Sequence, residues 1–186
     1  MRFGDDADVT LDDTDLRILG QLQEDCRTSL ARIGEVVGLS APAVLERIKK
    51  LEAAEVITGY HARLEGRRLG LDITAFIGVM VGHPRTLLEF ERQVIALEDV
   101  LECHHVTAGY SLLLKVKTEN TSALERLISQ IRSIDGVTRT ETMVVLSTHT
   151  ERTQLALPRP EQTAVGNGGK RARRSGERPG HHGRAT

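Results

Sequence analysis

The stretch SLARIGEVVGLSAPAVLERIKKL, residues 29–51, predicts two short helices joined by a three-residue turn. Ile33 and Val37 share one helical face, and Gly38 can adopt the left-handed conformation in which helices often end. Ser40 supplies a capping hydroxyl for the next helix, and Pro42 falls in its first turn, where a missing N–H costs nothing. The stretch is therefore typical of a helix-turn-helix.

Segments on either side extend this unit. Leucines recur at helical spacing before it, which predicts a first helix capped by Asp12 or Asp13 and ending near Asp25. Residues 56–64 alternate between apolar and polar, which predicts a short strand suited to a winged variant or a linker. Three short helices with this turn form the layout of a DNA-binding helix-turn-helix.

The periodicity changes at Asp72. Residues 73–81 read as a strand that is apolar on both faces and therefore central or covered. The order then predicted is a helix at 85–97, strands at 100–107 and 112–117, a helix at 122–134 and a strand at 137–148. This βαββαβ order predicts a ferredoxin-like sandwich and gives the chain an α+β fold class. Its helices cover one face of the sheet, and a second subunit is the simplest cover for the other.

Composition excludes several classes of protein. The longest apolar stretches fall far short of the roughly 20 residues that span a bilayer, and the N-terminus has no apolar signal core. We therefore expect a cytoplasmic protein without a membrane partner. Cys26 and Cys103 suggest no disulfide framework, and we expect both to be small buried hydrophobic residues. Aromatic residues make up only 3%, too few for a stacking platform for single-stranded nucleic acid.

The net charge of −1 is a cancellation between segments of opposite sign. Residues 1–25 carry −6, residues 27–68 carry +3, residues 69–157 carry −3 and residues 158–186 carry +5. The last segment contains no Leu, Ile, Phe or Met, so we expect it to be disordered. Its cluster Lys170–Arg174 either lies along DNA phosphates or serves only as a solubilising extension.

The second helix of the predicted motif supplies most of the candidate DNA contacts. Small and apolar side chains dominate its first turn, so we expect modest base specificity and a contribution from DNA shape. A folded three-helix domain whose cations are merely solvated is the alternative. The candidate DNA-binding residues are Ser29, Ser40, Ala41, Pro42, Ala43, Leu45, Glu46, Arg47, Lys49 and Lys50.

Other candidate chemistry is sparse. The turn formed by Thr107, Ala108, Gly109, Tyr110 and Ser111 either holds a small zwitterion through backbone amides and hydroxyls or is an ordinary hairpin. The sequence from 103 to 105 (Cys-His-His) lacks the spacing of a structural zinc site, so we expect no metal. We found no nucleophile beside a base, no paired carboxylates and no phosphate loop, and therefore expect neither an enzyme nor a cofactor.

Over residues 11–152 the chain resembles the Lrp/AsnC, or feast/famine, family of regulators. The matching stretches are Leu11-Asp-x-x-Asp15-x-x-Ile18-Leu19, Leu22-Gln-x-Asp25-x-Arg27, Val37-Gly-Leu-Ser40, Leu45-Glu-Arg47-Ile-Lys-Lys-Leu51-Glu, Ile57-x-Gly59-Tyr60, Glu102-Cys-His-x-Val106 and Leu113-Leu-Lys115. The resemblance implies a nucleoid-associated transcriptional regulator that binds double-stranded DNA. It also implies dimers that assemble into a tetramer of dimers, with amino acids bound between dimers.

The resemblance, together with the composition of the two ends, divides the chain. Residues 1–10 form an acidic leader, 11–72 the DNA-binding domain with its helix-turn-helix at 30–49, 73–152 the effector and oligomerisation domain, and 153–186 the basic tail. The effector pocket falls on residues 107–111, with Thr138, Thr140 and Thr142 contributed by a neighbouring subunit.

The chain departs from the family pattern at several positions. Ala108, Ser111 and Leu112 replace the usual glycine, aspartate and tyrosine of the turn, so a carboxylate for an α-ammonium group is missing there. Cys26 and Glu55 stand where the family favours glycine, and a non-glycine residue can adopt a left-handed conformation at a cost of about 1 kcal/mol.

Three hypotheses follow. The first is a sequence-preferring, homo-oligomeric regulator tuned by a small molecule. The second is an architectural protein that wraps or bridges DNA with little ligand response. The third, an enzyme or a stand-alone metabolite-binding module of the same sandwich class, is opposed by the helix-turn-helix.

Overall fold

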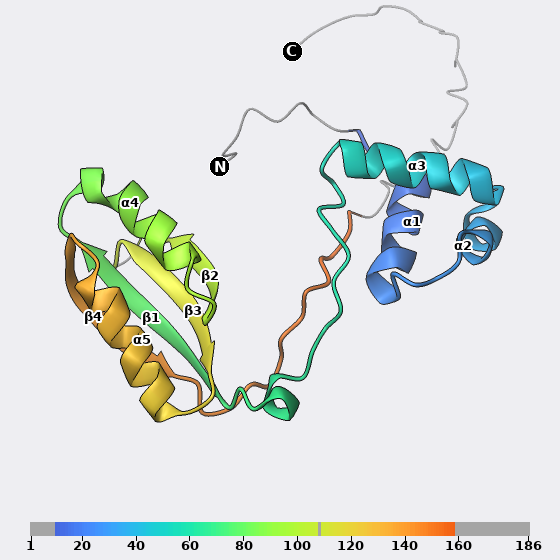
Figure 1. Cartoon of the computed structure of the whole chain (residues 1–186). Coiled ribbons are helices and arrows are strands. Elements are labelled where there is room, and N and C mark those ends of the chain that lie inside the picture. Colours follow the sequence, from blue (N-terminus) through green and yellow to red (C-terminus); the bar gives the residue numbers. More distant parts are fainter. Residues whose placement is uncertain (1–9, 108, 159–186) are drawn as a thin grey trace, which may run out of the picture. The chain divides into compact units, whose positions relative to one another are not determined.

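The computed structural model describes residues 10–107 and 109–158. Residues 1–9 of the predicted leader, Ala108 and the tail from residue 159 lie outside the described residues. Two compact units result: a helical unit of residues up to 57 together with 156–158, and a sheet unit of residues 58–155 (Figure 1). No helix among the described residues is long and apolar enough to cross a membrane.

The helical unit contains α1 (Asp13–Glu24), α2 (Leu30–Val37) and α3 (Ala41–Ala53). Asp12 caps α1 in a capping box with Asp15, in which each side chain accepts a hydrogen bond from the other residue's backbone N–H. Ile18, Ile33 and Val44, one from each helix, are fully buried and form the centre of the core. The predicted three-helix unit is therefore confirmed.

The ends of these helices test the expectations about left-handed residues. Gly38 closes α2 with φ 75°, and Glu55, just beyond α3, has φ 54°. Glu55 therefore accepts the strain expected of a non-glycine residue there. Cys26 does not take a positive φ and is exposed, so the prediction that it is buried was wrong. It lies in the short turn between α1 and α2, where no side chain covers it.

The short strand predicted at residues 56–64 is absent, which corrects the expectation of a wing or linker strand. The segment instead runs without regular structure into the 3₁₀ helix η1 (Gly66–Leu69). Alternation favours a strand only where a neighbouring strand accepts its backbone hydrogen bonds, and none of the described residues pairs with this segment.

The sheet unit contains β1 (Ile73–Val81), α4 (Pro84–Ile95), β2 (Val100–His105), β3 (Leu112–Thr118), α5 (Thr121–Ser133) and β4 (Val137–Val144). Its four strands are antiparallel in the order β2-β3-β1-β4. The predicted ferredoxin-like order is thus confirmed, with β1 central. The strands β2 and β4 end before the predicted residues 107 and 148. Ladder pairing of β4 stops where the Val145 N–H bonds to Thr74, because its partner β1 begins at Ile73.

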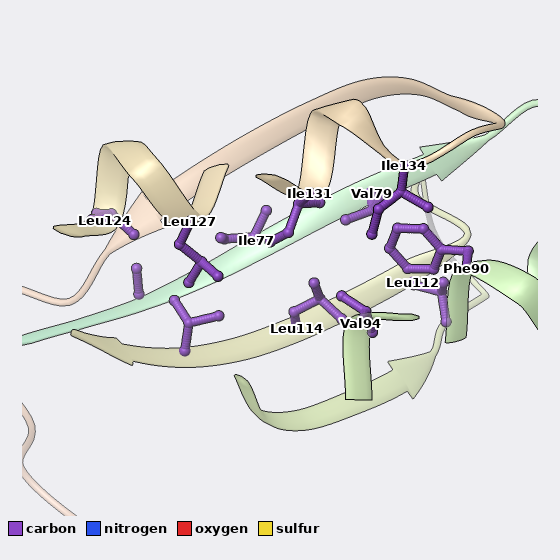
Figure 2. Packing of buried hydrophobic residues seen from close by; sticks show 12 residues of the cluster. Ile77, Val79, Phe90, Val94, Leu112, Leu114, Leu124, Leu127, Ile131 and Ile134 are labelled. Atoms are coloured by element: carbon purple, nitrogen blue, oxygen red, sulfur yellow. The ribbon is translucent and has the colours of Figure 1, made fainter. Parts of the chain in front are cut away.

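One face of the sheet packs against α4 and α5. Ile77 and Val79 of β1 lie on this face beside Leu114 of β3, and Phe90 of α4 and Leu127 of α5 pack over them (Figure 2). All five side chains are at most 2% exposed. Cys103 packs against the same core and is half-buried. The alternate residues of each strand point to the opposite face, against which neither α4 nor α5 packs, and which we call the uncovered face.

Candidate nucleic-acid interface and ligand turn

In the helix-turn-helix, the backbone of α2 lies very close to the turn that leads into α3. A Cβ on Gly34 would lie 2.4 Å from the Leu39 carbonyl oxygen, so only glycine fits there. Sequence reasoning did not single out Gly34, although a glycine inside a predicted helix is a recognisable signal of close packing. Gly34 therefore sets how α3 is presented.

Two of the candidate DNA-binding residues cap the helices of the motif. The Ser29 hydroxyl accepts a hydrogen bond from the Arg32 N–H at 3.3 Å, and the Ser40 hydroxyl accepts one from the Ala43 N–H at 3.4 Å. Both serines are exposed, and each hydroxyl keeps its own proton for donation to a phosphate.

The start of α3 presents two apolar side chains and one acidic side chain to solvent. Pro42, Leu45 and Glu46 are exposed, whereas Ala41 and Ala43 are half-buried. An aliphatic side chain such as Leu45 can contact a thymine methyl group, but it cannot donate or accept a hydrogen bond at a base edge. This surface therefore supports few direct base contacts.

Arg47 is engaged within the protein. Its Nη1 lies 2.7 Å from Asp12 Oδ2 and 2.7 Å from Asp15 Oδ1, and its side chain is 33% exposed. The Arg47 hydrogen bond is the largest of the effects that lower the pKa of Asp12, and the two aspartates raise the pKa of Arg47. Arg47 thus ties α3 to the first turn of α1, a role that the sequence pattern did not reveal.

The two lysines of α3 differ in their surroundings. Lys50 lies 3.3 Å from Glu46 one turn earlier, and both side chains are well exposed. Lys49 is exposed and pairs with no acidic side chain among the described residues. Of the predicted phosphate contacts on α3, Lys49 is therefore the most available.

The turn after β2 folds back against β1. The Ser111 N–H donates to the Val79 carbonyl at 2.9 Å, and the Ser111 hydroxyl accepts from the Val81 N–H at 3.2 Å. Thr107 and Gly109 are exposed, and Ala108 lies outside the described residues. The described part of this turn offers hydroxyl and backbone groups to a ligand, and no carboxylate.

Tyr110 lies over the uncovered face of the sheet. A Cβ on Gly78 of β1 would lie 2.7 Å from its ring, so the glycine makes room for the aromatic side chain. A hydrogen bond with Glu141 of β4 raises the pKa of Tyr110, and Arg139 lies 3.1 Å from Glu141. Tyr110 therefore belongs to the turn and also lies on the uncovered face of the sheet.

The three candidate threonines of β4 lie elsewhere. Thr140 and Thr142 pair with Val79 and Ile77, which places them on the helix-covered face. Arg132 of α5 donates to the Thr140 hydroxyl at 3.0 Å, and Thr138 donates to the Met80 carbonyl at 3.2 Å. A shallow pocket of about 180 Å³ includes Thr138 and Thr140. Within one chain, Tyr110 and these threonines are on opposite faces of the sheet.

Among the described residues, no three acidic, histidine or cysteine side chains are grouped so that they could hold a metal ion. His104 pairs with Glu102 at 3.1 Å, and His105 contacts Glu91 of α4. The Cys-His-His run is thus distributed between two separate His–Glu contacts and the core.

Comparison with protein families matches both units. The AsnC-type helix-turn-helix domain matches residues 11–52, and the Lrp/AsnC ligand binding domain matches residues 74–155. The HTH-type transcriptional regulator FL11 of Pyrococcus abyssi is 35% identical over 149 residues, covering 80% of this chain and 98% of FL11. The regulatory protein AsnC of Escherichia coli is 32% identical over 148 residues, covering 77% of this chain and 95% of AsnC.

Solved structures of two regulators resemble the structure of this chain. The structure of E. coli AsnC superposes with a TM-score of 0.74 at 30% identity, covering 78% of this chain and 99% of AsnC. A transcriptional regulator of Neisseria meningitidis in complex with L-methionine has a TM-score of 0.75 at 30% identity, covering 79% of this chain and 97% of that protein.

Proposed function

Because the chain belongs to the Lrp/AsnC family of transcriptional regulators, and not to a family of enzymes, we propose that it is a homo-oligomeric, sequence-preferring DNA-binding regulator tuned by a small molecule. We assign DNA binding to residues 11–72, effector binding and self-association to 73–152, and a separate role to the tail at 153–186. An amino acid is the effector class we favour, because the related Neisseria regulator was solved with L-methionine.

The observation that carries the DNA-binding part is the exposed α3 surface behind the capped turn. Ser29 and Ser40 present hydroxyls at the starts of α2 and α3, and Lys49 and Lys50 present cations further along α3. Phosphate contacts of this kind fix the position of the protein on the duplex, whereas base edges supply specificity. With Pro42 and Leu45 at the leading turn, we expect DNA shape to contribute to the preference.

Self-association is supported by the uncovered face of the sheet. Phe76 pairs with Met143 across β1 and β4, and Leu113 lies opposite Gly78 on β3, so apolar side chains gather there. Met80 and Met143 are exposed in the single chain. A second copy that covered this face would bury apolar surface. Each Å² buried in this way would stabilise the dimer by about 25 cal/mol.

Effector control requires a ligand with different affinity for different assembly states. Tyr110 provides a physical connection, because it belongs to the candidate effector turn and lies over Gly78 on the face that a second copy would cover. A ligand that moves Tyr110 would alter that face. Thr138, Thr140 and Thr142 of a neighbouring copy would complete the pocket, since they lie on the opposite face within one chain.

Two measurements test the proposal. A titration at physiological salt should show tighter binding to the DNA upstream of the protein's own gene than to a random duplex of equal length. Calorimetry with the twenty amino acids, combined with sedimentation, should show one that binds at micromolar to millimolar affinity and changes the oligomeric state. Equal affinity for both duplexes would refute the sequence preference.

An architectural role is the second candidate. The Ser111 hydroxyl already accepts a bond from Val81, and the described turn residues include no carboxylate for an ammonium group. The small side chains that open α3 likewise favour binding with little sequence preference. If no amino acid binds in calorimetry while the protein still compacts or bridges random duplex DNA, this second candidate replaces the first.

A further inference from the structure

The strand β4 forms one edge of the sheet (Figure 1), and in the part of the chain that the structure describes no strand pairs with its outer side. The Val145 N–H donates to the Thr74 carbonyl of β1. Hydrogen bonding alternates along an antiparallel strand, so the backbone groups of Thr140 and Thr142 point away from β1. Their N–H groups are therefore available to a ligand at this edge.

A β-bulge interrupts β4 beside these residues. Arg139 pairs with Met80 and Val137 pairs with Val81, so Thr138 is an extra residue with no partner on β1. The Thr138 hydroxyl donates to the Met80 carbonyl at 3.2 Å, which ties the bulge to the neighbouring strand. Bulges of this kind end regular pairing and redirect side chains, often next to functional sites.

Arg132, in the last turn of α5, supplies a cation at the same place. Its Nε donates to the Thr140 hydroxyl at 3.0 Å, which positions the guanidinium beside β4. The four N–H groups on its two terminal nitrogens remain for a ligand, since a guanidinium carries five donors. Among the described residues no carboxylate pairs with Arg132. The cation is thus held in place while its charge is not neutralised.

A pocket of about 180 Å³ lies where the bulge, the free edge and this cation meet. Two of its lining residues are cations, two carry hydroxyls and none is acidic: Arg132, Val137, Thr138, Arg139 and Thr140. Arg139 lies 3.1 Å from Glu141, so Arg132 is the cation available to a ligand. Drug-sized ligands occupy about 300–1,000 Å³, so this pocket suits a smaller molecule with a negative charge.

We propose that this pocket binds the carboxylate group of the small effector, with Arg132 as its cationic partner and with Thr140 donating from its backbone N–H and its hydroxyl. The inference deepens the proposed effector binding and rests on it. A guanidinium matches a carboxylate through two parallel hydrogen bonds. The Thr140 hydroxyl accepts from Arg132 and keeps its own proton for the ligand.

The same residues define the class of the ligand. None of the residues that line the pocket is acidic, and the described part of the turn at 107–111 offers no carboxylate. Nothing in either place would pair with an α-ammonium group. The site therefore recognises a small carboxylic acid by its acid group, and an amino acid and the 2-oxo acid with the same side chain both satisfy it.

Calorimetry with matched compounds tests this assignment. The full chain is titrated with L-alanine, L-leucine and L-methionine, with the 2-oxo acid of each, and with the amine of each that lacks the carboxylate. At least one amino acid should bind at micromolar to millimolar affinity, and its 2-oxo acid should bind within about threefold of it. The corresponding amine should not bind.

Variants identify the residues that carry the binding. Arg132→Met should weaken both acids about 10- to 100-fold, the loss expected for hydrogen bonds to a charged group. Arg132→Lys keeps the charge without the planar fork and should give an intermediate loss. Thr140→Val should weaken both acids, whereas Thr140→Ser should retain their affinity. Arg126→Met is the matched control, because it removes another exposed arginine of α5 that does not line the pocket.

The contrary outcomes are distinct. An amino acid that binds while its 2-oxo acid does not would overturn the inference, because an ammonium partner would then be required. Equal affinity in the native chain and Arg132→Met would also overturn it and leave the proposed function intact. Inorganic phosphate that displaces the acid with equal affinity would show a general anion site and overturn the assignment to carboxylates.

A failure of the proposed function has a different signature. If no acid binds, this inference and the effector part of the proposed function fail together, while the preference for upstream DNA is measured independently. Sedimentation without ligand completes the test. Arg132→Met protein that dissociates there, with no acid bound by the native chain, would show that the edge of β4 contacts a second copy instead.

Discussion

Replacing Arg47 with methionine should destabilise the helical unit and leave the number of DNA phosphate contacts unchanged. Methionine keeps the aliphatic stem of the side chain and removes the guanidinium that joins α3 to the first turn of α1. The bond to Asp15 is the better shielded of the two, because the Asp15 side chain is 16% exposed and that of Asp12 is 53% exposed.

The expected magnitude follows from this shielding. A charged hydrogen bond with a partly buried partner contributes about 1.5–3 kcal/mol, whereas an exposed ion pair contributes about 0.2–1 kcal/mol. Together the two bonds of Arg47 should stabilise the helical unit by about 2 kcal/mol. For a unit of this size that corresponds to a fall in Tm of roughly 8–16 °C. Lys50→Met removes a cation of the same helix whose pair with Glu46 is exposed, and should cost under about 0.5 kcal/mol.

The difference in stability between the native chain and Arg47→Met should depend on pH. Arg47 lowers the pKa of Asp12 in the folded state, so the charged carboxylate is favoured by folding. Its stabilisation is present above the unfolded pKa of about 3.9 and is lost as the pH falls through the folded value. The stability gap between the native chain and Arg47→Met should therefore be constant from about pH 5 to pH 8 and shrink below about pH 4.

Thermal unfolding followed by circular dichroism of the full chain measures the stability, and the salt slope of DNA binding measures the contacts. Lys49→Met should lower that slope by about 0.9, whereas Arg47→Met should leave it unchanged. An Arg47→Met protein with native stability and a slope reduced by about 0.9 would show that Arg47 contacts phosphate instead.

Three further substitutions probe other parts of the molecule. Glu55→Gly should raise the free energy of unfolding by up to about 1 kcal/mol in urea titrations, because glycine relieves the left-handed strain at φ 54°; an Ala control that proves more stable would contradict this. Gly78→Ala should displace the Tyr110 ring from Glu141, so that a spectrophotometric titration finds a lower pKa for this tyrosine, whereas Gly109→Ala, with open space around its Cβ, should not. Phe90→Ala should cost the sheet unit about 3–5 kcal/mol in urea titrations, and equal losses from the exposed Leu88→Ala would argue against this packing.

Local patterns sufficed for most of the fold because each helix and strand carries its own signal. Gly38 and Ser40 mark a helix end and a helix start, and the alternation at 73–81 continues into a central strand with partners on both sides. The same alternation at 56–64 misled, because a strand forms only when another segment accepts its hydrogen bonds. Such a partner is a property of the tertiary structure and leaves no mark on the alternating segment itself.

The candidate site was less predictable for a related reason. From sequence alone, a surface cation on a recognition helix is expected to contact phosphate. The partners that occupy Arg47 are Asp12 and Asp15, which lie thirty-five and thirty-two positions earlier in the sequence. Leu157 shows the same principle in reverse, since one leucine in a polar segment predicts nothing until Gly20 is found beneath it. The contacts of Arg47 change which cations of α3 are free to meet DNA. The charge that α3 offers to DNA is therefore decided by long-range contacts.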